Sequence, residues 1–548
     1  MQFDIKDQDA YFLQRYKWLC HNPYHHPIAS HTHTYNHCHL SAMWYSILLF
    51  LPVLLLFFRR HYYSRNPKKP NLPPGPKPWP IIGNLNLIGP LPHISIHSLS
   101  RKYGPLMHLK FGFDSVVVGS SVEVAELLLK THDLSFSSRP QLLAGKYLTY
   151  DYTGMGTAPY SPYWRQARKI CVMELLSPKR LDQFEYMRVE ERKLFLHDMF
   201  KSCSKPVQLK DRLYMLNLST MSRMVLGKRY TEEDENNIVT PKEFTEMLEE
   251  LFLVHGTLDI GDAIPWLAPL DLQGHVKRMK DVNRKLDRFY EQILDERYAR
   301  KKSGKDQGVN DMVDVLVQFA DDPTLEVKIE RHQLKAIIQD LLTAGTDTSA
   351  LNVEWAMSLL LKNPEAIQKA TEELDRVIGR DRWVQEKDIV NLPYIQAIVK
   401  ETMRLHPVVP LLIPRVARED CKVAGYDLLK NSRVLINIWT IGRDPTIWEK
   451  PNEFWPDRFI GKEIDVKGHD YELLPFGSGR RMCLGYGLGL KLVQSSLANL
   501  LHGFEWKLPG DMKRQDLDME ERFGLTTCKK NPLVVVPTKP RLPHHLYS

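Results

Sequence analysis

The sequence is poor in cysteine. Its 548 residues include seven cysteines, an odd number, and no pair has Cys-x-x-Cys spacing. A secreted disulfide framework needs paired cysteines, and a structural zinc site needs ligands at short, regular spacing. We therefore expect a protein of a reducing compartment that has neither feature.

A dominant charge of one sign is also lacking. The chain carries 74 Lys and Arg against 66 Asp and Glu, a net charge of +8. No basic stripe with interleaved aromatic residues is present, so nucleic acid is not an expected partner. Internal repeats are absent, and no linker divides the chain after residue 81. We expect one large domain over residues 81–540.

Long apolar runs are scarce, and the one clear case lies at residues 40–58 (LSAMWYSILLFLPVLLLFF). As a helix this run would span about 28 Å, close to the hydrocarbon thickness of a bilayer. Basic residues follow it, which predicts that the rest of the chain is cytosolic. We interpret residues 43–60 as a single transmembrane anchor and residues 61–80 as a basic, proline-rich linker. A cleaved signal peptide is the alternative, but no small-residue cleavage site follows.

Residues 1–42 contain seven histidines. A metal-binding tract is one interpretation of such a composition. We prefer a disordered extension or an artefact of gene prediction, because Met43 directly precedes the apolar run and would make a natural start.

Hydrophobic periodicity predicts a mainly α domain with a small β part. Helical patterns cover 180–203, 241–255, 275–301, 333–362, 364–378, 394–405 and 484–502. Strand-like runs are fewer and cover 106–111, 115–118, 423–424 and 433–438.

A glycine-rich turn leads into a cysteine at residues 475–489 (PFGSGRRMCLGYGLG). Gly477 and Gly479 allow positive φ and a close backbone approach. Cys483 stands just before a predicted helix, whose free N–H groups favour a thiolate. A buried structural thiol is the ordinary alternative for a single cysteine.

The surroundings of this cysteine carry a resemblance to a known family. The spacing Phe476-x-x-Gly479-x-Arg481-x-Cys483-x-Gly485 resembles the signature of the cytochrome P450 superfamily at every fixed position. The resemblance implies that Cys483 ligates the iron of haem b (iron-protoporphyrin IX) and that Arg481 pairs with a propionate. It also places Phe476, Gly477 and Gly485 against the cofactor.

A second motif, Ala344-Gly345-Thr346-Asp347-Thr348-Ser349, interrupts the helical pattern at 333–362, because its glycine and hydroxyl residues are poor interior helix formers. We expect a local kink or groove there. An acid followed by a hydroxyl suits proton delivery to bound dioxygen. The alternative is that Asp347 or Thr348 caps a second helix. The segment resembles the family's oxygen-activation motif, with Thr348 and Asp347 as its catalytic pair.

Other segments resemble family motifs that support the cofactor. Glu401 and Arg404 share a helix face at i, i+3, and with Arg458 they resemble a buried structural triad; by themselves they would be a solvated surface pair. Trp164 and Arg168 resemble a Trp-x-x-x-Arg propionate contact, and Arg415 resembles another. Plain core packing is the alternative for Trp164.

The resemblance covers residues 70–540 and points to a plant microsomal, A-type member near the flavonoid hydroxylase-like and homoterpene-forming subfamilies. It implies a P450 fold, an endoplasmic reticulum membrane location, O2 as co-substrate, and NADPH electrons from an NADPH-cytochrome reductase. A basic proximal face is expected to dock that reductase, formed by Arg165, Lys169, Lys179, Arg180 and Arg480.

The expected reaction is monooxygenation of a lipophilic plant metabolite such as a flavonoid, phenylpropanoid or terpenoid. Two alternatives remain: a haem-thiolate isomerase or dehydratase that needs no reductase, and a non-catalytic haem-binding protein. Thr348 favours monooxygenation, because family members that rearrange peroxides usually lose it. The regions expected to line the substrate pocket are 139–160, 215–224, 252–258, 342–346, 408–413 and 523–526.

Overall fold

The computed structural model describes residues 51, 54, 70–232, 239–303 and 311–548. The chain divides into two compact units, Met1–Pro70 and Asn71–Ser548. The predicted extension over 1–42 and the predicted anchor over 43–60, apart from Leu51 and Leu54, lie outside the described residues. Within the described ranges, no helix has both the length and the apolar character needed to cross a membrane.

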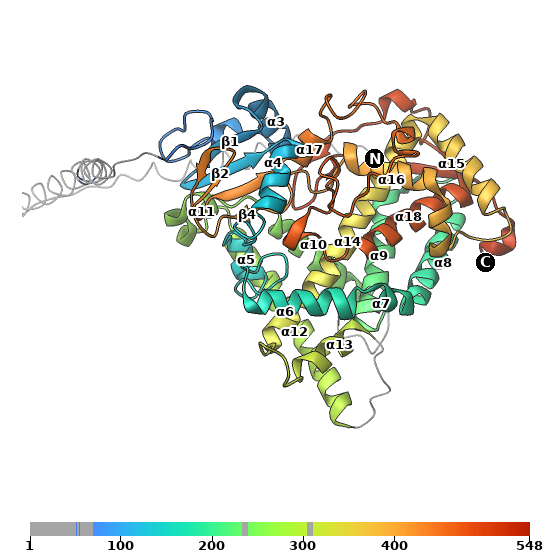
Figure 1. The fold of residues 1–548 in the computed structure, drawn as a ribbon. Coiled ribbons are helices and arrows are strands. Elements are labelled where there is room, and N and C mark those ends of the chain that lie inside the picture. The colour runs from blue at the N-terminus through green and yellow to red at the C-terminus, as the bar shows by residue number, and fades with distance from the viewer. Residues whose placement is uncertain (1–50, 52–53, 55–69, 233–238, 304–310) are drawn as a thin grey trace, which may run out of the picture. The chain divides into compact units, whose positions relative to one another are not determined.

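Helices account for most of the second unit, and the labelled strands β1, β2 and β4 lie together at one side of it (Figure 1). The α-helices are α3 (Pro92–Tyr103), α4 (Val122–Glu126), α5 (Leu143–Leu148), α6 (Pro162–Ile170), α7 (Pro178–Gln183), α8 (Glu185–Lys201), α9 (Leu209–Leu226), α10 (Pro241–His255), α11 (Ile260–Ala263), α12 (His275–Lys302), α13 (Met312–Ala320), α14 (Arg331–Lys362), α15 (Pro364–Val377), α16 (Pro393–Leu405), α17 (Ile438–Ile441) and α18 (Tyr486–Gly503). The strands are β1 (Leu106–Phe111), β2 (Asp114–Gly119), β3 (Val207–Gln208), β4 (Arg415–Val416), β5 (Cys421–Val423), β6 (Tyr426–Leu428), β7 (Arg433–Ile436), β8 (Phe504–Lys507), β9 (Glu521–Arg522), β10 (Cys528–Lys529) and β11 (Val534–Pro540).

The long helix α14 runs through the middle of the unit and packs against α9, α16 and α18 (Figure 1). Its first half places apolar side chains three and four residues apart, and Leu334, Ile337 and Ile338 are fully buried. Both large hydrophobic clusters include residues of α14. The predicted helix over 333–362 is thus present, and it lies at the centre of the fold.

The largest sheet has the strand order β1-β2-β7-β4. Strands β1 and β2 form an antiparallel hairpin, and β2 pairs with β7 in parallel. Of the strand predicted at 423–424, Val423 is the last residue of β5, whereas Ala424 begins a turn: Ala424 and Gly425 have φ of 49° and 83° and connect β5 to β6. Such a turn suits a two-residue hairpin connection.

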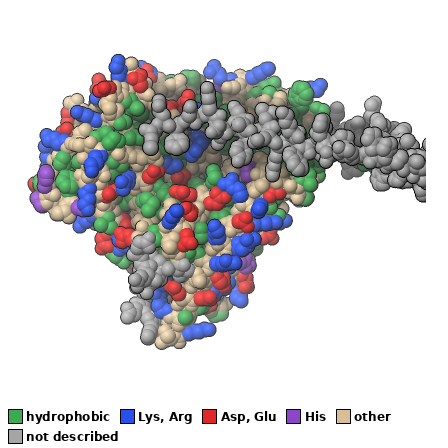
Figure 2. All heavy atoms as spheres, turned by 180° about the vertical axis from the view of Figure 1, so that it is seen from behind, with side chains coloured by type: hydrophobic (Ala, Val, Ile, Leu, Met, Phe, Trp, Pro, Cys, Tyr) green, Lys and Arg blue, Asp and Glu red, His purple; other side chains and the backbone are tan. Residues whose placement is uncertain are grey.

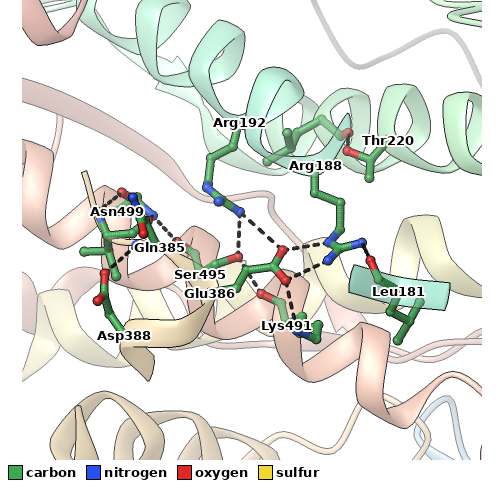
Figure 3. Close-up of polar contacts among 12 residues, drawn as sticks. Leu181, Arg188, Arg192, Thr220, Gln385, Glu386, Asp388, Lys491, Ser495 and Asn499 are labelled. Atoms are coloured by element: carbon green, nitrogen blue, oxygen red, sulfur yellow. Dashed lines mark hydrogen bonds and ion pairs between the residues drawn. The ribbon is translucent and has the colours of Figure 1, made fainter. Parts of the chain in front are cut away.

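The helix predicted over 180–203 is two helices. Buried Phe184 (φ −94°, ψ 7°) ends α7 and precedes α8. Helix α8 then carries buried Arg188, which donates two 2.7 Å hydrogen bonds to Glu386 (Figure 3). Lys491 of α18 reaches the same carboxylate at 3.1 Å, so this network ties α8 to the helix that follows the cysteine loop.

Residues 71–80, assigned above to the linker, lie in the second unit. The Asn71 N–H donates to Asp427 Oδ2 at 2.8 Å, and the His108 N–H donates to the Pro74 carbonyl at 2.9 Å. At the other end, Tyr547 is 2 % exposed, so the packed unit continues past residue 540.

Candidate functional site

The cysteine loop has the geometry that its glycines predict. Gly477 and Gly479 have φ of 68° and 69°. A Cβ on Gly479 would lie 2.6 Å from the Leu129 carbonyl oxygen, so only glycine fits there. The Cys483 N–H donates to the Phe476 carbonyl at 2.9 Å. The loop therefore fixes the cysteine just before α18 begins at Tyr486.

The pKa of the Cys483 thiol is raised by its surroundings. Burial among protein atoms raises its pKa, whereas the Gly485 N–H and the Arg168 guanidinium lower it. Although protein surrounds the thiol, the residue itself is exposed. Both the burial of the thiol and the exposure of the residue are explained if the side chain lies inside the protein and faces open space. A thiol in that position suits an iron ligand, and the alternative of a fully packed structural thiol does not fit.

Four arginines from separate elements converge beside the cysteine loop. Arg415 of β4 donates to Asp133 Oδ1 at 2.8 Å and to the Ser478 carbonyl at 2.6 Å. Arg168 of α6 donates to the Met482 carbonyl at 2.9 Å. Arg139 donates to the carbonyls of two residues just before β4.

Arg481 completes this arginine cluster. It donates to the carbonyls of Ser137 and Ala158 at 2.5 and 2.6 Å. Its guanidinium also lies 3.9 Å from the centre of the Trp164 ring, and the Trp164 Nε1–H donates to the Met155 carbonyl at 3.2 Å. Trp164 is thus both a core residue and a support for the cluster.

The arginine cluster holds more positive charge than its protein partners neutralise. Burial, followed by repulsion from the other arginines, lowers the pKa of Arg139 and Arg481. Asp133 is the one carboxylate that bonds these arginines within the described residues. Arg139 Nε is buried without a hydrogen-bond partner there. A dianionic group such as a pair of haem propionates fits this donor set.

The oxygen-side motif lies within an unbroken helix. Helix α14 continues through 344–349, so the alternative of a second helix capped by Asp347 or Thr348 is wrong. The hydroxyls of Thr346 and Thr348 each donate to the carbonyl four residues earlier at 2.7 Å. Ala344 is exposed in the middle of this otherwise buried helix. The motif thus presents small side chains and a hydroxyl to open space inside the protein.

Asp347 turns toward a distant part of the chain. It is 8 % exposed, and its Oδ2 accepts a 2.7 Å hydrogen bond from Thr526 Oγ1. Burial raises the pKa of Asp347, while Lys210 and the Thr526 hydroxyl lower it. The two residues of the predicted catalytic pair therefore have different partners.

Glu401, Arg404 and Arg458 form one buried network. Arg404 donates to both Glu401 oxygens at 2.7 and 2.8 Å, and Arg458 donates to Oε1 at 3.0 Å. Their side chains are at most 3 % exposed, so the alternative of a solvated surface pair is wrong. The remaining guanidinium N–H groups bond backbone carbonyls of 442–453.

Several predicted substrate regions meet. A Cβ on Gly256 would lie 2.2 Å from the Leu525 nitrogen, so the end of α10 packs on segment 523–526. The Thr527 N–H, next to that segment, donates to the Val408 carbonyl at 2.7 Å. Met221 of α9 lies against Gly345 of α14.

Three residues of the site belong to no sequence motif: Asp133, Arg139 and Thr526. Arg139 and Thr526 stand in regions expected to line the substrate pocket, but no pattern assigns either of them a role of its own. Each acquires its role through a contact across a long stretch of chain, such as the 274 residues between Arg139 and Ile413.

The sequence model of the cytochrome P450 family matches residues 73–535. Trimethyltridecatetraene synthase of Zea mays is 44% identical over 528 residues, covering 90% of this chain and 94% of that protein. A flavonoid 3'-monooxygenase of Petunia hybrida is 43% identical over 516 residues, covering 93% and 99%. A zebra fish cytochrome P450 structure with progesterone matches the fold with a TM-score of 0.70 at 24% identity, covering 81% of this chain and 99% of that one.

Proposed function

This chain belongs to the cytochrome P450 family of haem monooxygenases, and on that premise we propose that it oxygenates a hydrophobic plant metabolite with electrons from an NADPH-cytochrome reductase. The observation that carries the proposal is the pairing of an accessible Cys483 with a cluster of four arginines. The first suits iron ligation, and the second suits the propionates of the same cofactor.

The proposed roles follow from the contacts. Cys483 is the iron ligand, and Arg139, Arg168, Arg415 and Arg481 hold the propionates. A thiolate-ligated haem supplies the activation of O2 when it is bound. The Thr348 hydroxyl and the Asp347 carboxylate would hold and move protons for this chemistry, since an acid and a hydroxyl on successive helical residues supply the groups for such a route. The buried Glu401 network stabilises the fold behind the cysteine loop and takes no part in the chemistry.

The substrate class is proposed from the relatives and from the meeting of apolar segments. Flavonoids, phenylpropanoids and terpenoids are the candidates, because relatives named flavonoid 3'-monooxygenase and trimethyltridecatetraene synthase share more than two fifths of the sequence. Leu525, Met221 and Val408 come from regions expected to line the pocket. Apolar lining with few polar groups suits such molecules.

The test is turnover of a panel of flavonoids and terpene alcohols by the full chain with a plant reductase, NADPH and isotopically labelled O2. We expect a product that carries one labelled oxygen atom and forms only with NADPH. Product without NADPH would indicate an isomerase or dehydratase. Haem binding without any product would indicate a carrier.

We also propose that the second unit rests on the endoplasmic reticulum membrane through an exposed apolar surface of its own. Two chain regions supply exposed apolar side chains: 79–82 with the β1–β2 turn, and the connection from α10 to α12. The Phe113 N–H donates to the Ala263 carbonyl at 2.9 Å, which joins the two regions. The exposed residues are Trp79, Ile81, Ile82, Phe113, Leu258, Ile260, Trp266, Leu270 and Leu272.

Such an apolar surface is unusual for a protein in water and indicates a membrane or partner. By contrast, charged side chains of both signs are interspersed over the lower part of the face in Figure 2. Hydrogen exchange of the full chain in phospholipid vesicles is the test. We expect slower exchange over 258–272 than in detergent-free buffer, and unchanged exchange would contradict the membrane contact.

The proposed docking face for the reductase lies on the side of α6 and the cysteine loop. Arg165 and Arg480 keep about half of their side chains exposed. Lys169 and Lys179 are exposed as well. A basic face of this kind attracts an acidic partner mainly by raising the association rate.

A further inference from the structure

The β9–β10 hairpin contacts the oxygen-side helix through one hydrogen bond between side chains. Thr526 Oγ1 donates to Asp347 Oδ2 at 2.7 Å, and the two residues lie 179 positions apart in the chain. Both side chains are buried, at 9 % and 8 % exposed. A short hydrogen bond from a hydroxyl to a buried carboxylate favours the charged form and fixes its orientation.

The hairpin that carries Thr526 is anchored at its base. Glu521 of β9 accepts from His93 Nε2 at 2.8 Å and pairs with His406 Nδ1 at 2.9 Å. His406 in turn stacks on Trp355 of α14 with ring centres 4.0 Å apart. The contacts of the hairpin therefore fix the position of Thr526 independently of its hydrogen bond to Asp347.

Asp347 and Thr348 point away from the helix axis in different directions, because successive helical residues are about 100° apart. The Thr348 hydroxyl donates to the Ala344 carbonyl, and the Asp347 carboxylate meets the hairpin. An acid held in this way must turn before it can exchange a proton with the hydroxyl beside it.

We propose that Thr526 is a positioning residue, whose hydroxyl holds the Asp347 carboxylate against the hairpin. The inference rests on the proposed role of Asp347 in moving protons. It joins that role to segment 523–526, which is expected to contact substrate. A substrate that shifts this segment would then change how readily the carboxylate turns toward Thr348.

Other charged and titratable groups also face Asp347 and act on its titration. They are Lys210 and Tyr214 of α9, Glu249 of α10, Glu354 of α14 and Arg522 of β9. Thr526→Val leaves all of them in place and removes a single donor. The change is close to isosteric, so packing is retained.

The neighbouring threonine provides a matched control. Thr527 is 3 % exposed, and its Oγ1 has no hydrogen-bond partner among the described residues. Thr527→Val therefore makes the same chemical change one residue away without touching Asp347. Thr526→Ser keeps the hydroxyl and is the conservative variant.

The experiment is infrared titration of the full-length protein with isotope-labelled aspartate, in which Asp347→Asn identifies the Asp347 band. We expect Thr526→Val to move the midpoint of that band upward by about one pH unit, since a hydrogen bond to a charged group is lost. Thr526→Ser and Thr527→Val should titrate as the unaltered protein does. Equal midpoints in Thr526→Val and the unaltered protein would overturn the inference, as would an equal shift in Thr527→Val.

Function is read separately, as the fraction of NADPH electrons that is released as hydrogen peroxide in the presence of reductase. We expect this fraction to rise several-fold in Thr526→Val and to return to normal in Thr526→Ser. If the infrared midpoint shifts while no variant oxygenates any substrate, the positioning role stands and the proposed monooxygenase function fails. If oxygenation is normal and the midpoint does not move, only the positioning role fails.

Discussion

Two groups of buried arginines in this protein are balanced in different ways. In the Glu401 network, Arg404 and Arg458 share one carboxylate, and their other N–H groups donate to backbone carbonyls. In the arginine cluster, Arg415 is the one of the four guanidinium groups that bonds a carboxylate among the described residues, that of Asp133. Burial lowers the pKa of all four, and repulsion from neighbouring arginines adds to this effect for all of them except Arg415.

This difference separates a structural network from a binding site. A buried charge is tolerated when it is paired and hydrogen-bonded, as in the Glu401 network. The arginine cluster does not meet that condition, because its positive charge exceeds the negative charge of its protein partners. An anionic ligand would balance this excess. The same residue type therefore stabilises the fold in one place and prepares a cofactor site in the other.

The largest effect is expected from Glu401→Gln. This change leaves Arg404 and Arg458 buried without their carboxylate, and breaking such a pair costs about 3–5 kcal/mol. Chemical unfolding should show a loss of this size, with little folded protein recovered. A loss below about 1 kcal/mol would contradict the role of the Glu401 network in stabilising the fold.

Arg168→Met should act on the cofactor more than on the fold. Removing one of four repelling cations should change the stability of haem-free protein by less than about 1 kcal/mol. Haem release should quicken about 10–100-fold, because a charge-assisted hydrogen bond is lost. Transfer of haem to an excess of an apo acceptor protein measures the rate.

Arg165→Met is the control for that experiment, since Arg165 lies on the same helix with half of its side chain exposed. It should release haem at the unaltered rate. The distinction between the two arginine groups is lost if Arg168→Met unfolds the haem-free protein as Glu401→Gln does.

Asp340 provides a pH test beside the arginine cluster, because it accepts from the Met155 N–H at 2.5 Å and burial raises its pKa to about 6. Below pH 3.8 the carboxyl is protonated in the folded and unfolded chain alike. Between pH 3.8 and 6 the unfolded chain ionises first, so stability falls as pH rises. The free energy of unfolding of Asp340→Asn should therefore exceed that of the unaltered protein by about 1–2 kcal/mol between pH 4 and 7, after allowance for partial exposure. If the free energy of unfolding depends on pH in the same way in Asp340→Asn and in the unaltered protein, the raised pKa of Asp340 is contradicted.

The smallest effect is expected from Arg480→Met. Arg480 pairs with Asp133 at 2.8 Å while half of its side chain stays exposed, and such pairs contribute about 0–1 kcal/mol. Stability should barely change. Association with the reductase should slow a few-fold at low salt, and the difference should vanish at high salt. A salt-independent difference would argue against electrostatic docking.

The sequence predicts those parts of the site whose geometry is determined by residues close together in the chain. The cysteine loop depends on Gly477 and Gly479 within a few residues of Cys483, so its turn follows from the order of residues. The same holds for Asp347 and Thr348 on one helix. Arg139 and Thr526 could not be found in this way, because their partners lie far along the chain.

The fold shows the same division. The first half of helix α14 has an apolar periodicity. By contrast, α9 is buried nearly all round, including polar Asn217 and Thr220, and has no helical pattern of burial. Its length therefore escapes a periodicity argument. The break between α7 and α8 depends on the tertiary packing of Phe184, which no local pattern signals.

The most direct measurement is the reduced carbon-monoxide difference spectrum of freshly prepared full-length protein and of Cys483→Ser. The account predicts the absorption band of thiolate-ligated haem in the unaltered protein and its loss in the variant. A band typical of imidazole-ligated haem, or a variant whose spectrum matches that of the unaltered protein, would contradict the assignment of Cys483.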